Sequence, residues 1–395
     1  MTAIGSRAWV LTLAALTATT ALSIDMSLPA QPAIAGAFGV GSAASQLTLS
    51  PFLVGYSAGM LLVGALSDRF GRRAILLASL AVFFAGGVAS ALAPSIGMLV
   101  GARILQGFGA SGGPVLARAM VRDTQPIASA ARILASMMSA LALAPMIAPA
   151  IGGVLLDGIG WRAIFGALGL VAVGFLVIVA ATLEETLPRA RRASLAPAAI
   201  ARNYAVFFRT SSVRAPMLAI CLGFGAQFAF ISASPFVLIE HYGVATKHYA
   251  FYFGATALAL MGGARGAGQL LRGRTPRAVW RFGAAVLFTG SVATAAASRV
   301  DALGIAGLMA PVLVVFVGIG LTNPSTTAMA LEPVPTIAGT ASAIMGASQM
   351  LSGAAAGWIV ARVGGSDAHT LGSAIGLLGA SAAAMVLLPS RPRPR

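Results

Sequence analysis

The chain consists mainly of long apolar segments that are separated by short polar stretches. Windows of about 20 mostly apolar residues, the length that crosses the hydrocarbon core of a bilayer, recur about twelve times. They cover residues 8–30, 45–66, 74–93, 96–120, 131–156, 162–182, 213–239, 248–271, 279–298, 302–328, 338–362 and 369–389. Proline and glycine interrupt many of them, which is common in bundles of membrane helices. The pattern therefore predicts an all-α integral membrane protein with twelve transmembrane helices.

Composition excludes an ordinary soluble domain. Of the 395 residues, 58% are hydrophobic and only 9% are charged, against about 25% charged in a typical soluble protein. The first window has an alternative interpretation as a cleaved secretory signal, because Arg7 precedes it and the small residues of PAIAGA follow it. Its length, and Asp25 within it, favour a retained helix.

The net charge of +16 follows from the distribution of the basic residues and requires no nucleic acid partner. If the windows cross the membrane alternately, 21 of the 26 basic residues fall on one side, four fall on the other side, and Arg103 lies inside a window. Basic loops stay in the cytoplasm. We therefore expect both termini, including Arg391, Arg393 and Arg395, to be cytoplasmic.

The longest polar connection separates the sixth window from the seventh and contains LEETLPRARRASLAPAAIARN. It predicts an N-terminal six-helix bundle at 1–182, a cytoplasmic linker at 183–212 and a C-terminal six-helix bundle at 213–395. The lone Cys221 excludes an intramolecular disulfide.

The stretch GALSDRFGRR at 64–73 places an acid, three arginines and two glycines where a helix meets the cytoplasm. Small residues at Gly64 and Gly71 allow close backbone approach, and Asp68 is suited to pair with an arginine or a helix terminus. Such a cluster is able to latch two helix bundles together. Arg122 and Asp123 belong to the same cytoplasmic network or form a solvated pair.

This loop resembles the G-x-L-x-D-R-x-G-R-R signature of the major facilitator superfamily. The matching residues are Gly64, Leu66, Asp68, Arg69, Gly71, Arg72 and Arg73. The resemblance implies a major facilitator fold with two pseudo-symmetric six-helix bundles that alternate access, and a loop that controls the conformational switch. In the second half, the counterpart GARGAGQLLRGR at 263–274 has no acid.

Two further segments resemble the drug:proton antiporters with twelve helices. RILQGFGASGG at 103–113 has an intramembrane arginine followed by glycines, and APMIAPAIGG at 144–153 resembles the antiporter motif. The residues of that motif are Pro145, Pro149, Gly152 and Gly153, with Ala148 where the family normally has glycine. Five other segments are similar to segments of the bicyclomycin and chloramphenicol resistance transporters. They are DMSLPAQP, GWRAIF, EETLP, SASPFVL and AGTASAIMGASQ.

Asp25 and Arg103 are the candidates for proton coupling. Ionisable groups inside a membrane span usually face a cavity, a partner or a proton path. At 1.5 Å per residue, Asp25 lies roughly 8 Å and Arg103 roughly 9 Å below the same outer surface. We expect them to interact directly, or through water and substrate, and drug binding to oppose protonation of Asp25. The alternatives are a wetted interfacial acid, a structural ion pair, and an arginine that snorkels to the surface.

The substrate cavity is predicted from polar and aromatic members of the spans, each of which is equally suited to helix packing. They are Gln46, Tyr56, Gln227, Phe230, Asn323 and Gln349. No metal-ligand spacing and no phosphate-binding loop is present, so we expect neither an enzyme nor a cofactor, with the proton gradient as the energy source.

The sequence thus predicts a monomeric, proton-coupled exporter of small apolar or amphipathic drugs in the bacterial inner membrane. The alternatives are an exporter of a sugar or amino acid derivative on the same fold, and a non-transporting membrane sensor or scaffold.

Overall fold

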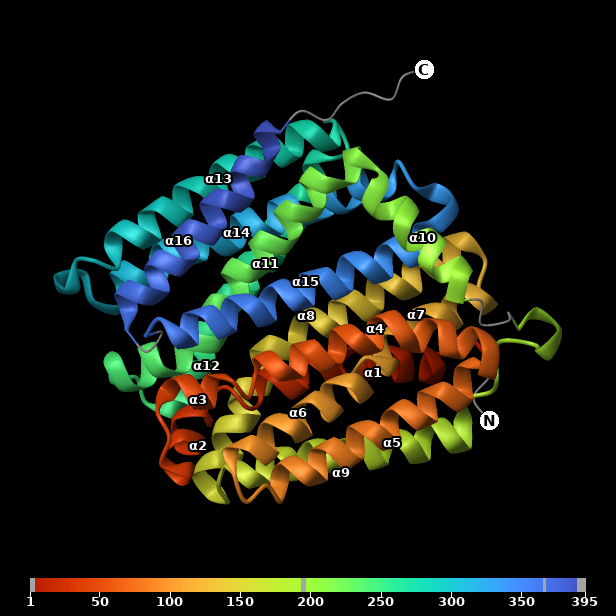
Figure 1. Cartoon of the computed structure of the whole chain (residues 1–395), viewed down its shortest axis with the longest axis horizontal. Coiled ribbons are helices and arrows are strands. Elements are labelled where there is room, and N and C mark those ends of the chain that lie inside the picture. Colours follow the sequence, from red (N-terminus) through yellow and green to blue (C-terminus); the bar gives the residue numbers. More distant parts are fainter. Residues whose placement is uncertain (1–3, 193–196, 365–366, 389–395) are drawn as a thin grey trace. The chain divides into compact units, whose positions relative to one another are not determined.

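The computed structural model describes residues 4–192, 197–364 and 367–388, and within them every regular element is helical (Figure 1). The C-terminal Arg391, Arg393 and Arg395 lie outside the described residues. The chain divides into two compact units, Met1–Leu195 and Ala196–Arg395. The division falls inside the polar connection between the sixth and seventh apolar windows.

Within its described residues, 4–192, the first unit contains nine α-helices. They are α1 (Arg7–Asp25), α2 (Gln31–Phe38), α3 (Ser42–Gln46), α4 (Ser50–Phe70), α5 (Arg72–Ala91), α6 (Ile96–Ala110), α7 (Gly112–Thr124), α8 (Ile127–Gly158) and α9 (Trp161–Thr182), followed by the 3-10 turn η1 (Arg189–Arg191). Helix α6 packs between α4 and α5, α5 packs on α9, and α1 packs on α8.

In the described part of the second unit, residues 197–364 and 367–388, α10 (Pro197–Arg209) is followed by six long helices. They are α11 (Ser211–Pro235), which ends in the π-helical turn η2 (Phe236–His241), α12 (Thr246–Leu270), α13 (Pro276–Ala297), α14 (Gly304–Leu331), α15 (Ala338–Arg362) and α16 (Ala368–Ala384). The short turns η3 (Asp301–Leu303), η4 (Pro335–Ile337) and η5 (Met385–Leu387) complete it. Helix α14 packs between α12 and α13, α13 packs on α16, and α11 packs on α15. Each unit therefore repeats one packing plan.

Glycines make the close crossings of this plan possible in both units. At Gly55 and Gly107, between α4 and α6, an added Cβ would overlap a backbone carbonyl of the opposite helix. The same holds at Gly263 and Gly320, between α12 and α14. Small residues let membrane helices approach until their backbones touch, which supplies van der Waals contact that lipid cannot replace.

Ten of the described helical segments are long and apolar enough to cross a membrane. The other two of the twelve predicted spans are α12, which carries Lys247 and Arg265, and the α6–α7 pair, whose members have 15 and 13 residues. Several of the predicted boundaries need correction. The first helix ends at Asp25 rather than near Ala30, α7 continues to Thr124, and the linker contains α10.

The break between α6 and α7 has a local cause. Pro114 has no N–H group, so the carbonyl of Ala110 lacks its usual helical donor. The side chain of Thr20 on α1 donates to that carbonyl, with an oxygen–oxygen distance of 3.4 Å. A neighbouring hydroxyl thus satisfies the group that proline leaves free, as membrane helices require.

Candidate functional site

The turn between α4 and α5 consists of one residue, Gly71. Its φ of +102° lies in the region that residues with a side chain rarely adopt. A Cβ at this position would also overlap the carboxylate of Glu185. The glycine of the predicted loop is therefore required by both the backbone conformation and the neighbouring acid.

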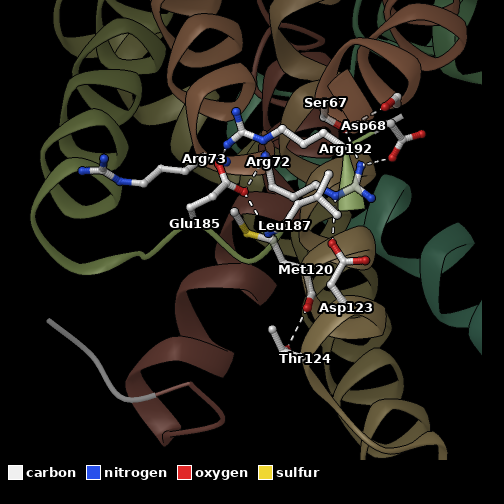
Figure 2. Close-up of polar contacts among 11 residues, drawn as sticks. Ser67, Asp68, Arg72, Arg73, Met120, Asp123, Thr124, Glu185, Leu187 and Arg192 are labelled. Carbon is white, nitrogen blue, oxygen red and sulfur yellow. Dashed lines mark hydrogen bonds and ion pairs between the residues drawn. The ribbon is translucent and has the colours of Figure 1, made fainter. Parts of the chain in front are cut away.

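Arg72, the first residue of α5, is the centre of a polar cluster that joins α4, α5 and α7 (Figure 2). Its guanidinium donates to Asp123 at 2.8 Å, to Ser67 at 2.6 Å and to Asp68 at 2.5 Å. Only 8% of the residue is exposed. Charge-assisted bonds in a partly buried place are stronger than those of a solvated pair, so the cluster holds the three helix ends together.

Glu185 also belongs to this cluster, although the sequence assigned it no role beyond its place in EETLP. Its carboxylate accepts hydrogen bonds from the backbone N–H groups of Arg72 at 2.8 Å and Arg73 at 3.3 Å. It also accepts from the N–H of Leu187 at 3.0 Å and lies 3.8 Å from Arg192. A carboxylate at a helix N-terminus satisfies free donors and opposes the positive end of the helix dipole. The position of EETLP directly after the sixth window was the available signal.

The remaining residues of the loop are placed less centrally. Arg73 donates to the carbonyl of Ala180 at 2.6 Å and so ties α5 to the end of α9, whereas the exposed Arg69 lies over the ring of Phe70. Arg122 is exposed on α7. The predicted close approach at Gly64 is not found within the first unit, because an added Cβ would meet only Val115, at 3.9 Å.

The end of α1 brings Asp25 against the antiporter-motif helix α8. Asp25 is the last residue of α1 and is 5% exposed. Gly152 of α8 packs directly on the backbone of the next residue, Met26, where a Cβ would overlap the carbonyl oxygen. Elsewhere in the motif Pro149 and Gly153 are buried and Pro145 is half-buried.

Arg103 on α6 is completely buried and acts as a clasp between segments of the first unit. Its guanidinium donates to the side chain of Gln106 at 2.6 Å, to the carbonyl of Ser23 at 3.2 Å and to the carbonyl of Thr48 at 3.3 Å. The rings of Phe52 and Phe165 lie 4.4 and 5.5 Å from its central carbon. We refer to these contacts as the Arg103 clasp.

The carbonyl of Ser23 is free to join the clasp because the last turn of α1 tightens. The N–H of Ser27 donates to Ile24 instead of to Ser23. Such free carbonyls at a helix end need a donor from elsewhere, and Arg103 supplies it. Among the ion pairs of the described residues none joins Arg103 to Asp25, so the direct pair that the sequence allowed is not formed, and Arg103 does not snorkel.

The clasp continues into a buried polar turn formed by α2 and α3. Ser45 donates to the side-chain oxygen of Gln31 at 2.8 Å, and the Gln31 amide donates to Thr48 at 3.2 Å. All three residues are at most 1% exposed. Arg103 therefore connects this turn with the end of α1 that carries Asp25.

The six predicted substrate contacts are divided between the units. In the first unit Gln46 is buried in α3, and Tyr56 is buried on α4 with its ring stacked on Phe52. In the second unit Phe230 is buried against Phe316, whereas Gln227, Asn323 and Gln349 are half-buried. Their binding roles stay predictions.

Comparison with known proteins gives consistent matches over most of the chain. The model of the "Major Facilitator Superfamily" matches residues 13–357. An uncharacterized MFS-type transporter, YdgK, of Bacillus subtilis is 33% identical, with 84% of this chain and 83% of that protein covered. A chloramphenicol resistance protein of Pseudomonas aeruginosa is 30% identical, with 82% of this chain and 76% of that protein covered. A bicyclomycin resistance protein homolog of Haemophilus influenzae is 28% identical, with 89% of this chain and 88% of that protein covered.

Among solved structures, a D-xylose–proton symporter superposes with a TM-score of 0.74 at 19% identity. The match covers 96% of this chain and 97% of that one. At this identity the likeness concerns the fold.

Proposed function

Because the chain belongs to the major facilitator superfamily, we propose that it exports drug-like compounds across the bacterial inner membrane in exchange for protons. Two of the relatives are named for resistance to chloramphenicol or bicyclomycin, and each match covers more than three quarters of both chains. The proposal that export is coupled to protons rests on the position of Asp25. Its carboxylate is buried at the end of a membrane helix, beside Gly152 of the antiporter motif.

In this proposal Asp25 changes charge during each cycle. A charged group inside a membrane span is costly unless water or a partner solvates it, so the protonated and ionised forms favour different surroundings. Drug binding near Asp25 and its protonation then compete, and inward-moving protons return the empty transporter. The Arg103 clasp keeps the end of α1, and with it Asp25, in a defined place.

The cluster around Arg72 is assigned to conformational control rather than to substrate binding. It lies at the ends of α4, α5 and α7, where the basic residues predict the cytoplasmic side. Its charge-assisted bonds make these helix ends move together when one unit changes its tilt during alternating access. Both termini are cytoplasmic in this orientation.

The direct test is proton release on addition of drug to the purified, unbuffered protein in detergent. Chloramphenicol and bicyclomycin are the first compounds to compare, with the native chain against Asp25→Asn. We expect release from the native protein and none from the variant, which still binds the compound. Equal release from a variant that binds normally would remove Asp25 from the coupling mechanism. If neither compound binds and a sugar or amino acid derivative does, the exporter serves a metabolite.

A further inference from the structure

Helix α10 is the first helix of the second unit and is rich in apolar residues, although the sequence predicted only a polar linker there. It ends at Arg209, and α11, the first span of the second unit, begins two residues later at Ser211. Phe207 of α10 is buried in a hydrophobic cluster with Val213 of α11 and Ile344 of α15. Helix α10 is thereby attached to the end of the bundle at which α11 begins (Figure 1).

The rest of α10 presents large apolar side chains away from this cluster. Phe208 is 53% exposed and Val206 is 44% exposed. At 100° per residue these two side chains flank the buried Phe207 on either side of the helix. Exposed apolar residues on an amphipathic helix that leads directly into a membrane span are typical of a helix in the bilayer interface.

Arginines cover the face of α10 opposite Phe207. Arg202 and Arg209 are exposed there, and Arg214 is exposed on the first turn of α11. Within the described chain none of the three takes part in an ion pair. From residue 196 to residue 239 the sequence contains no acid. These guanidinium groups therefore have no protein carboxylate nearby in sequence to neutralise them.

We propose that α10 lies in the headgroup layer of the cytoplasmic leaflet and binds anionic phospholipids. Phe208 and Val206 reach the boundary of the acyl chains, and Arg202, Arg209 and Arg214 bind the phosphate groups. Guanidinium suits phosphate because it donates two parallel hydrogen bonds, and basic segments beside a membrane span are attracted to anionic lipid. The proposal rests on the cytoplasmic placement of the linker, and not on the identity of the transported drug.

The depth of α10 is measured with a nitroxide label on Phe208→Cys in a Cys221→Ala background. Collision with oxygen, which concentrates in the bilayer, is compared with collision with a water-soluble nickel chelate. We expect position 208 to favour oxygen and a control label on Gly273→Cys, in the loop between α12 and α13, to favour nickel. Equal exposure of both labels to nickel would overturn the interfacial placement.

The lipid preference is measured by native mass spectrometry and by drug transport in liposomes. Membranes of phosphatidylcholine alone are compared with mixtures that contain phosphatidylglycerol. In the native chain we expect preferential retention of phosphatidylglycerol, reduced about fivefold for each arginine removed in Arg202→Gln and Arg209→Gln. Arg202→Lys and Arg209→Lys keep the charge and restore most of the preference.

The matched control is Arg299→Gln, which removes a basic residue from the predicted outer side. It leaves the phosphatidylglycerol preference unchanged if the headgroups bind at α10. The proposal would be overturned if Arg299→Gln lowered the phosphatidylglycerol preference as much as the α10 variants do. It would also be overturned if the variant that carries both Arg202→Gln and Arg209→Gln kept the native preference. Drug transport by the native chain in any one lipid tests the proposed function separately.

Discussion

The Arg103 clasp predicts a large loss of stability when the guanidinium is removed. Arg103→Met keeps much of the side-chain length but leaves the carbonyls of Ser23 and Thr48 and the Gln106 oxygen without their donor. A buried acceptor left unsatisfied costs about 1–3 kcal/mol, so three give about 3–9 kcal/mol. Methionine also removes the desolvation penalty of a buried cation, which offsets several kcal/mol. With the middle of the first range, about 6 kcal/mol, and an offset of about 3 kcal/mol, we expect a net destabilisation of about 3 kcal/mol.

Unfolding of the purified protein by titration with a denaturing detergent measures this loss. Arg103→Lys keeps a charge but lacks the planar fork, so it is expected to fall between the native chain and Arg103→Met. Arg162→Met is the matched control. Arg162 stacks on Trp161 and donates to the carbonyl of Ala93, but it is exposed at the start of α9. Its loss should cost no more than about 1 kcal/mol.

A stability of Arg103→Met within about 0.5 kcal/mol of the native chain would refute this reasoning, because surface substitutions without special contacts fall in that range. It would mean that the stabilising contacts of the guanidinium only balance the free-energy cost of its desolvation. A loss equal to that of Arg162→Met would lead to the same conclusion.

Two further substitutions test the first unit. Gly152→Val would make side-chain atoms overlap the backbone of Met26, so we expect overpacking to destabilise the protein by at least about 1–3 kcal/mol. Size-exclusion chromatography should then show a loss of folded protein. The control Gly158→Ala, which has open space around it, should be tolerated. Glu185→Gln weakens the cap of α5 by about 1 kcal/mol and lowers the midpoint of thermal unfolding. The control is Glu184→Gln, one residue away, which should leave this midpoint unchanged. An unchanged midpoint in Glu185→Gln, or a folded Gly152→Val, would contradict the contact concerned.

Most of the membrane spans and the family could be predicted from the sequence because both depend on local patterns. Hydropathy defines a membrane helix from its own residues, and the loop at Gly64 to Arg73 is contiguous. The predicted major facilitator fold and the family resemblance are confirmed by the family match over residues 13–357 and by the superposition on a symporter of that fold.

The contacts that join distant segments were less accessible. Glu185 reaches α5 from beyond α9, and no spacing rule connects the two. An interaction of Arg103 with Asp25, directly or through water and substrate, was inferred from their common depth; the direct ion pair is not among those of the described residues, because depth does not fix direction around the helix axis. The free carbonyl of Ser23 depends on a one-residue tightening of α1 that the sequence does not signal.

The short, arginine-bearing α6 has a consequence for how the protein is made. It forms one predicted span together with α7, and an arginine at the centre of a membrane helix costs about 2.5–3.5 kcal/mol on insertion scales. The two carbonyls that Arg103 binds belong to α1 and to the turn before α4, both of which leave the ribosome earlier. We therefore expect α6 to enter the bilayer beside partners that are already inserted, which would make the order of translation part of the folding mechanism.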